Sequence, residues 1–256
     1  MRVVFAGPSL ADSGVGRGDP RLTFRPPAAQ GDIARAVLDG ANVIGLIDGV
    51  FENVAAVWHK EILYALSAGV QTFGAASMGA LRAAECAPFG MVGVGRVFDD
   101  YASGRLIDDD AVAQVHGPEE LRHMALSEPL VNIEATLDVL LARRLIEPSE
   151  DLGLRARARA LFFKERTYER LLSLAGLPAA RQTEIAKLIA LHRKDQKRED
   201  AEELVARVAA APDARIAPPG HWRFAETEIW MRLLDGIARQ AGVTALRRQG
   251  PQPKET

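Results

Sequence analysis

The sequence lacks the features that mark several classes of protein. It has a single cysteine, Cys86, which excludes an intramolecular disulfide and an all-cysteine metal cage and is typical of a reducing compartment. No apolar run approaches the roughly 18–20 residues that span a bilayer. The first five residues are too short for the apolar region of a signal peptide. We therefore expect a cytoplasmic protein that does not cross a membrane.

The composition is that of a folded protein. The charge, however, is unevenly distributed along the chain. Hydrophobic residues make up 48% of its 256 residues, although only 6% are aromatic. Residues 1–150 contain 12 Lys and Arg against 20 Asp and Glu, whereas residues 151–256 contain 20 against 14. The arginines of the basic half are interleaved with glutamates, which disfavours nucleic-acid binding. The positive charge of this half is better explained by an acidic protein partner or by an ordinary solvated helix surface.

Four short apolar or β-branched runs predict strands, at residues 2–6, 22–24, 42–47 and 70–73. After Asn42, the run at 42–47 is continuously apolar, as expected for a strand buried on both faces. Apolar residues from Val54 to Ala65 recur at helical spacing after a cap at Asn53, which indicates a crossover helix. The sequence thus predicts an α/β fold: a parallel sheet of βαβ units with flanking helices, followed by a helical C-terminal part.

A helix that contains Arg82, Glu85 and Cys86 follows the strand at 70–73, the pattern is helical from Asp108 onward, and no further strand is expected. We predict an α/β core domain at residues 1–150, a helical C-terminal region at 151–246 and a disordered tail at 247–256. Within the helical region, a proline-rich hinge precedes a last helix near residues 226–240.

Ser77 is the first candidate for chemistry. It lies where the strand at 70–73 turns into a helix through small residues, a position that lifts a hydroxyl above the carboxyl ends of a parallel sheet. Backbone N–H groups from Met78 and Gly79 could stabilise an oxyanion there. The alternative is that Ser77 only caps the helix, as serines often do.

A nucleophilic serine needs a base, and His59 on the crossover helix is the first choice. Its helical neighbours are partly apolar, so it could instead be a core histidine, and His116 is the second choice. Asp48, directly after the buried strand, points into the crevice where open α/β sheets keep their sites and could orient an imidazole. An Asp-Gly turn is the alternative for Asp48.

Other residues near this edge of the sheet are weaker candidates for a functional role. Glu61, Arg82 and Glu85 are candidates for substrate binding or, alternatively, for ion pairs between helices. Cys86 fits a core position better than a nucleophile. The acids at 108–110 suit a solvated helix start better than a metal site, because consecutive helical residues point in different directions. No metal or cofactor is expected.

The chain resembles TfuA-like proteins. The resemblance rests on five segments in the expected order that cover most of residues 5–120, namely Gly7-Pro8-Ser9-Leu10, Pro26-Pro27-Ala28 with Gly31-Asp32, residues 44–51, residues 57–63 and residues 74–85. It adds Ser9 to the candidate substrate-binding residues. Residues 75–80 also resemble the segment around the nucleophilic serine of Clp-type peptidases.

The resemblance implies a function that composition and spacing do not. TfuA-like proteins are associated with YcaO enzymes, which use ATP to activate a peptide-backbone amide. The pair is associated with installing thioamides in ribosomally made precursor peptides or in a methanogen enzyme. The resemblance implies that this protein supplies sulfur from a ubiquitin-like carrier with a C-terminal thiocarboxylate. Ser77, activated by His59 and oriented by Asp48 or Glu61, would then attack the thiocarboxylate. The alternatives are a non-catalytic partner that docks on YcaO and channels sulfide, and a general peptidase.

Overall fold

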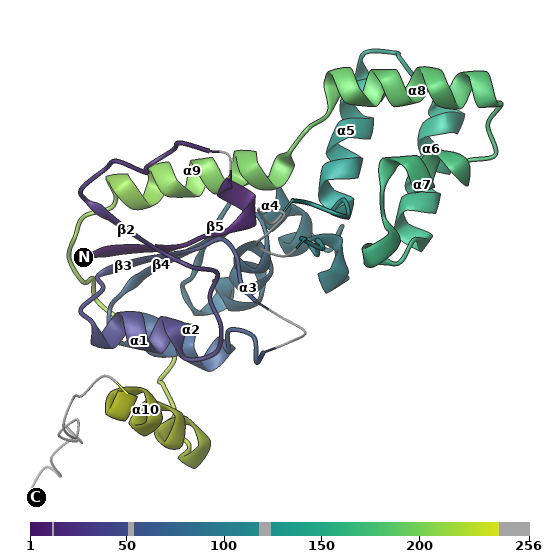
Figure 1. The fold of residues 1–256 in the computed structure, drawn as a ribbon. Helices are drawn as coiled ribbons and strands as arrows, with labels where there is room; N and C mark the ends of the chain where they lie inside the picture. The colour runs from purple at the N-terminus through teal and green to yellow at the C-terminus, as the bar shows by residue number, and fades with distance from the viewer. Residues whose placement is uncertain (12, 51–53, 118–123, 241–256) are drawn as a thin grey trace, which may run out of the picture.

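One parallel sheet organises the first part of the protein (Figure 1). The computed structural model describes residues 1–11, 13–50, 54–117 and 124–240. The strand order is β2-β1-β3-β4-β5, with all pairs parallel. The strands are β1 (Arg2–Phe5), β2 (Leu22–Arg25), β3 (Val43–Leu46), β4 (Gln71–Ala75) and β5 (Val92–Val94). The predicted α/β class is confirmed.

Strand β5 was not predicted, and the expectation of no strand after residue 73 is wrong. The strand has three residues with a glycine at its centre, and Val92 is exposed. Such a short run at the edge of a sheet carries neither the alternation nor the apolar length by which strands are recognised in a sequence. Pairing with β4 is what makes it a strand.

Helices cover both faces of the sheet (Figure 1). One face carries α1 (Asp32–Leu38), α2 (His59–Ser67) and α3 (Met78–Cys86), and α9 (Gln196–Ala210) crosses the other. The backbone of β3 approaches α9 closely, since a Cβ added at Gly45 would lie 2.7 Å from the Leu204 side chain. A segment that the sequence grouped with the helical C-terminal region therefore forms one layer of the α/β unit. Helix α4 (Arg96–Ala102) follows β5 and contacts α3 and α9.

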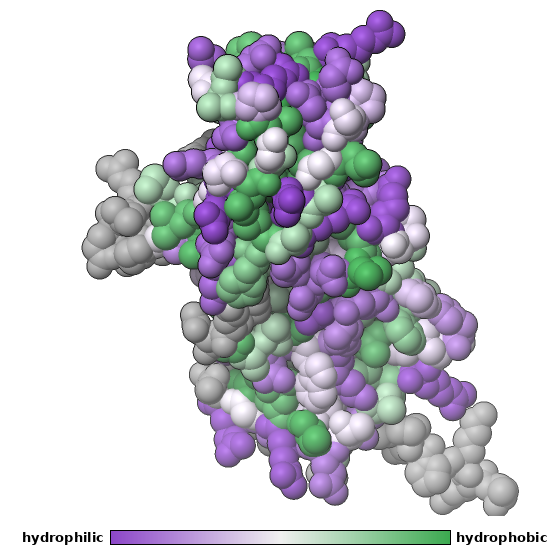
Figure 2. Space-filling view, turned by 90° about the vertical axis from the view of Figure 1, so that its right-hand side faces the viewer, coloured by the Kyte–Doolittle hydropathy of each residue, from purple (hydrophilic) through white to green (hydrophobic). Residues whose placement is uncertain are grey.

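Four further helices form a lobe beside the sheet (Figure 1). They are α5 (Leu130–Ala142), α6 (Pro148–Ala160), α7 (Tyr168–Ser173) and α8 (Ala179–His192). Hydrophilic side chains cover much of this side of the molecule, with small apolar patches between them (Figure 2). Several arginines of the lobe lie in ion pairs, such as Arg155 with Asp151 at 2.9 Å and Arg181 with Glu150 at 2.7 Å. This pairing reduces the positive potential that a nucleic-acid backbone would need.

The last helix, α10 (Glu228–Gln240), lies below α1 and α2 in Figure 1. Its buried Trp230 packs with Tyr64 of α2, with ring centroids 5.0 Å apart. The predicted helix near 226–240 is confirmed, whereas the predicted tail at 247–256 lies outside the described residues. None of the helices within the described residues has the length and apolar character to span a bilayer.

Helix α2 begins later than the sequence indicated. The expected cap, Asn53, lies outside the described residues, and Trp58 has extended backbone angles, so the helix starts at His59. The Glu61 carboxylate accepts a hydrogen bond from the Trp58 N–H at 3.1 Å, which fixes the first turn. The expectation that Val54 and Trp58 belong to the helix is therefore wrong, and His59 is its first residue.

Helix α3 packs directly onto the ends of β3 and β4. The Gly79 N–H donates to the Ile47 carbonyl at 3.1 Å, and a Cβ at Gly79 would lie only 1.8 Å from the Leu46 carbonyl oxygen. A Cβ at Gly74 would in turn lie 2.2 Å from the Gly79 carbonyl oxygen. Only glycine allows the helix to approach the sheet this closely.

The Gly79→Ala variant tests this packing. We expect it to lower the free energy of unfolding by about 2–3 kcal/mol, because the new methyl group forces α3 away from β3. The measurement is urea-induced unfolding followed by circular dichroism. Gly153→Ala is the control: this position in α6 is open, so alanine should stabilise the protein by about 0.5–1 kcal/mol through helix propensity. Equal effects of the two variants would contradict the close packing.

Candidate active site

The connection between β4 and α3 is a tight turn with a strained residue at its centre. The Ser77 N–H donates to the Ala75 carbonyl at 2.8 Å, which closes a three-residue γ-turn. Ala76, between them, has a φ of 67°, a value that residues with a side chain rarely adopt. Strained backbone of this kind persists only where its surroundings enforce it, and it is frequent at functional sites.

Ser77 occupies the N-cap position of α3 but does not cap the helix. Its side chain accepts no hydrogen bond from the first turn, and its Oγ has no hydrogen-bond partner among the described residues. The hydroxyl is partly buried and lies at the start of the helix. Ser77 therefore does not act as a simple capping serine in this structure.

The two expected oxyanion donors differ in their availability. The Gly79 N–H is already bonded to the Ile47 carbonyl, so it is not free to bind an oxyanion in this conformation. The Met78 N–H, at the first position of α3, has no partner among the described residues, and it is adjacent to Ser77. One helix N–H therefore remains available beside the hydroxyl.

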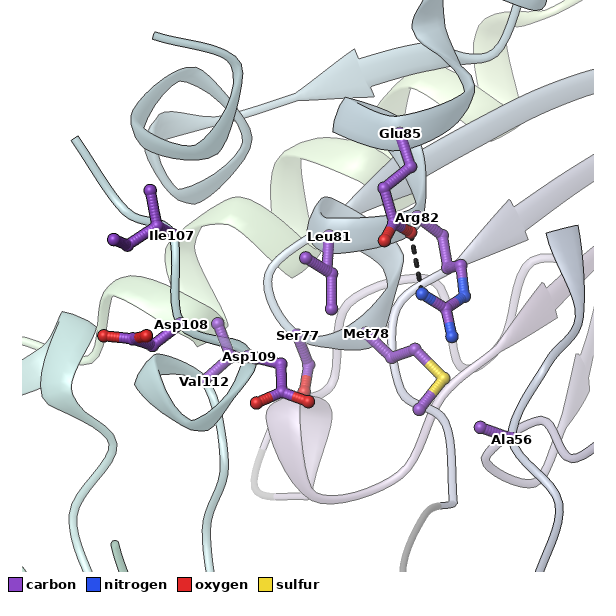
Figure 3. Close-up of a pocket in the computed structure, with 10 residues that line it drawn as sticks. All are labelled: Ala56, Ser77, Met78, Leu81, Arg82, Glu85, Ile107, Asp108, Asp109 and Val112. Carbon is purple, nitrogen blue, oxygen red and sulfur yellow. Dashed lines mark hydrogen bonds and ion pairs between the residues drawn. The ribbon is translucent and has the colours of Figure 1, made fainter. Parts of the chain in front are cut away.

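Ser77 opens into a pocket of about 420 Å³ at the carboxyl edge of the sheet (Figure 3). One wall is a single face of α3, and the opposite wall is the segment from Ile107 to Val112. The residues that line it are Ala56, Ser77, Met78, Leu81, Arg82, Glu85, Ile107, Asp108, Asp109 and Val112.

The pocket is rich in charge. The Arg82 side chain donates to the Val57 carbonyl at 3.0 Å and to the Glu85 carboxylate at 2.7 Å, so its guanidinium is held in place. Asp109 projects from the opposite wall toward Ser77 (Figure 3). Among the residues that the structure describes, no group of three or more His, Cys, Asp or Glu is arranged to hold a metal ion.

His59 lies at the surface beside the pocket and is not bonded to Ser77. Its Nε2 is 2.8 Å from the Glu85 carboxylate, which Arg82 also contacts. Burial raises the pKa of Glu85, but the hydrogen bonds from His59 and Arg82 outweigh it, so the pKa lies below its usual value. The alternative of a core histidine is excluded, because the side chain of His59 is 44% exposed.

Asp48 is buried but is not directed at an imidazole. Its Oδ2 accepts hydrogen bonds from the N–H groups of Gly7 at 2.8 Å and Ser9 at 3.1 Å, and its Oδ1 accepts one from the Ser9 hydroxyl at 2.7 Å. The carboxylate thereby ties the loop after β1 to the end of β3. The Ser-His-Asp chain of hydrogen bonds expected from the sequence is thus not formed in this structure, and catalytic roles for His59 and Asp48 stay predictions.

Glu61 is fully buried between two helix starts. Besides the Trp58 N–H, its carboxylate accepts a hydrogen bond from the Ala34 N–H of α1 at 3.3 Å. Burial raises its pKa despite these bonds. Its contacts join α1 to α2, and it does not line the pocket.

The pocket therefore gathers four of the predicted site residues, Ser77, Met78, Arg82 and Glu85. Gly79, Asp48, Ser9 and Glu61 lie in the surrounding framework. Sequence analysis missed the wall formed by Ile107, Asp109 and Val112. The acidic run at 108–110 was a visible signal, but nothing in the sequence shows that it faces Ser77 across a pocket.

These features define a parallel α/β protein whose pocket is built around a serine at a strained strand-to-helix turn. Residues 48–167, which contain the whole pocket, match the family model described as TfuA-like protein. The family supports a role as the partner of a YcaO enzyme in thioamidation. No curated protein matches the chain.

The buried thiol of Cys86 gives a test of the packing behind the pocket. Burial raises the pKa of Cys86 to about 12, well above that of an exposed cysteine thiol. Because the thiolate is the reactive form, alkylation of the native protein near pH 8 should be about 10³-fold slower than that of an exposed thiol. The measurement is iodoacetamide labelling of this single cysteine, followed by mass spectrometry. Full labelling after denaturation is the control, and rapid labelling of the native protein would contradict the buried position.

Proposed function

We propose that this protein is a serine hydrolase that releases sulfide from the C-terminal thiocarboxylate of a ubiquitin-like carrier, for use by its YcaO partner. The observation that carries the proposal is the Ser77 hydroxyl, which lies at a strained turn, lines the pocket and has no hydrogen-bond partner in the part of the chain that the structure describes. A serine that only stabilised the helix would use its oxygen to cap it. Backbone strain next to a serine that makes no capping hydrogen bond instead favours a chemical role for that serine.

The proposed reaction has two steps. In the first, Ser77 Oγ forms a bond to the carbonyl carbon of the thiocarboxylate, the C–S bond breaks, and sulfur leaves as hydrosulfide with the hydroxyl proton. The Met78 N–H stabilises the tetrahedral anion. In the second step, water cleaves the acyl-serine and yields the carboxylate of the carrier.

The mouth of the pocket suits an extended peptide tail. Ile107 is 81% exposed although it lines the pocket, so an apolar side chain is presented to an incoming chain. Arg82, although it pairs with Glu85, is the cation among the charged residues that line the pocket, and it offsets part of the negative charge of Glu85, Asp108 and Asp109 that an anionic thiocarboxylate would meet.

The Ser77→Ala variant tests the proposal. We expect it to lower the rate of sulfide release by about 10³-fold or more, because the variant has no atom that can form the acyl bond. The measurement is intact mass spectrometry of a ubiquitin-like protein with a C-terminal thiocarboxylate, incubated with and without the YcaO enzyme. Conversion to the carboxylate should occur with wild type alone.

The matched control is Ser67→Ala, which removes a hydroxyl that donates to the Tyr64 carbonyl at the far end of α2. It should keep the wild-type rate. Wild-type conversion rates in Ser77→Ala would exclude the serine mechanism. No conversion by the wild-type protein, with or without YcaO, would instead support a docking partner that channels sulfide.

A second variant tests the mouth of the pocket. Ile107→Asp should raise KM for the thiocarboxylated carrier about 10-fold and leave kcat unchanged, because it removes contact area that binds substrate and transition state equally. Leu152→Asp, at a similarly exposed position in α6, should change neither constant. A fall in kcat with an unchanged KM would contradict a role in carrier binding. The measurement is steady-state kinetics of sulfide release.

A further inference from the structure

A second pocket lies between the α/β unit and the helical lobe. It has a volume of about 230 Å³ and is lined by residues of α4, α5 and α6 and of the segment that follows α4. These residues are different from those that line the pocket of Ser77. The charged part of the lining consists of four arginines and two carboxylates, namely Arg96, Asp100, Arg105, Glu134, Arg155 and Arg159.

The two arginines of α6 are oriented by carboxylates. Arg155 donates through Nε to Asp151 at 2.9 Å and through Nη2 to Asp138 at 2.6 Å. Arg159 donates through Nε to Glu134 at 2.8 Å, and its Nη2 lies 2.7 Å from the same oxygen. In both side chains the Nη1 group has no partner within the described residues. The ion pairs therefore fix the guanidinium planes and leave N–H donors unused.

The two other arginines come from α4 and from the segment after it. Arg105 pairs through Nη2 with Asp100, and the Nε of Arg96 lies 3.6 Å from the same carboxylate. Arg96 also pairs through Nη2 with Asp138 of α5. Among the residues that the structure describes, the Nη1 groups of these two arginines likewise have no partner. The pocket thus contains four permanently charged guanidiniums whose donors are only partly used.

The cations of this pocket are more accessible than the carboxylates that hold them. The side chains of Arg105 and Arg159 are 67% and 59% exposed, whereas those of Asp100 and Glu134 are 14% and 13% exposed. The arginines therefore present their charge to solvent, and the carboxylates lie behind them. An anion that enters the pocket meets the guanidiniums first.

The arrangement of donors suits a phosphate group. The arginines reach the pocket from α4, from the segment after it and from α6, so their N–H groups approach from different directions. A planar carboxylate is satisfied by one guanidinium, whereas a tetrahedral phosphate has further oxygens for the others. When Asp138 and Asp151 are included, the carboxylates match the arginines in number. Binding therefore depends on the directed N–H donors and not on an excess of positive charge.

We propose that this pocket binds a phosphate group, either as inorganic phosphate or as the phosphate chain of a nucleotide. The inference does not depend on the proposed function of Ser77. The phosphate bridges Arg105, on the segment after α4, to Arg155 and Arg159 of the lobe. The same segment continues into Ile107, which lies in the wall of the Ser77 pocket. Bound phosphate therefore restrains this wall.

Isothermal titration calorimetry of the full-length protein with inorganic phosphate, at constant ionic strength in a chloride buffer, tests the site. Arg105→Gln should weaken phosphate binding about 10-fold, because it removes a charge-assisted hydrogen bond, while Asp100 keeps its contact with Arg96. The matched control is Arg207→Gln in α9. This arginine is 57% exposed, pairs with Glu203 and lies outside the pocket lining, so the variant should keep the wild-type affinity.

Arg159→Gln, on a different element, gives a second variant that should also weaken phosphate binding. Failure of phosphate to bind to the wild-type protein, or equal affinities of wild type and both pocket variants, would overturn the proposal. ATP and adenosine separate the two sources of the phosphate group. Tighter binding of ATP than of inorganic phosphate indicates the phosphate chain of a nucleotide, and equal or weaker binding indicates free phosphate. Binding of adenosine as tight as that of ATP would contradict a phosphate site.

Hydrogen exchange of the wild-type protein locates the bound phosphate without any variant. Phosphate should slow amide exchange in residues 105–110 by about threefold or more, because the bridge restrains this segment. Exchange in α10, which lies beside α1 and α2, should not change (Figure 1). Phosphate binding without slower exchange in residues 105–110 would place the anion elsewhere and refute the assignment.

Discussion

The contact between Gly79 of α3 and the end of β3 is the constraint on which the site depends. Helix α3 approaches the sheet so closely that its second residue donates a hydrogen bond to the Ile47 carbonyl. The chain must then leave β4 and enter α3 within three residues, which forces the positive φ of Ala76. The Ser77 hydroxyl and the Met78 N–H, which have no partner within the described residues, both owe their positions to this geometry.

Polar contacts around this turn hold the rest of the carboxyl edge in place. Asp48 binds the loop after β1, and Glu61 joins the starts of α1 and α2. Together they surround the pocket with fixed backbone, so its charged side chains are preorganised. Preorganised groups stabilise developing charge without a cost of reorganisation during the reaction.

Much of the fold, and the position of Ser77 at a strand-to-helix turn, were predictable from the sequence, because the signals are local. The strand at 42–47 and the small residues around Ser77 are recognisable without tertiary information. The position of His59 was not predictable in this way, because the start of α2 depends on the cap formed by Glu61. The hydrogen bonds of Asp48 depend on the neighbouring positions of β1 and β3 in the sheet.

The central claim is that Ser77 forms a covalent bond with the carrier, and the direct measurement is the mass of the protein itself. Wild-type protein mixed with the thiocarboxylated probe and quenched in acid at short times should carry the mass of the acylated probe, and digestion should locate the adduct on Ser77. Sulfide release without an adduct at any time, or an adduct on another residue, would contradict the account.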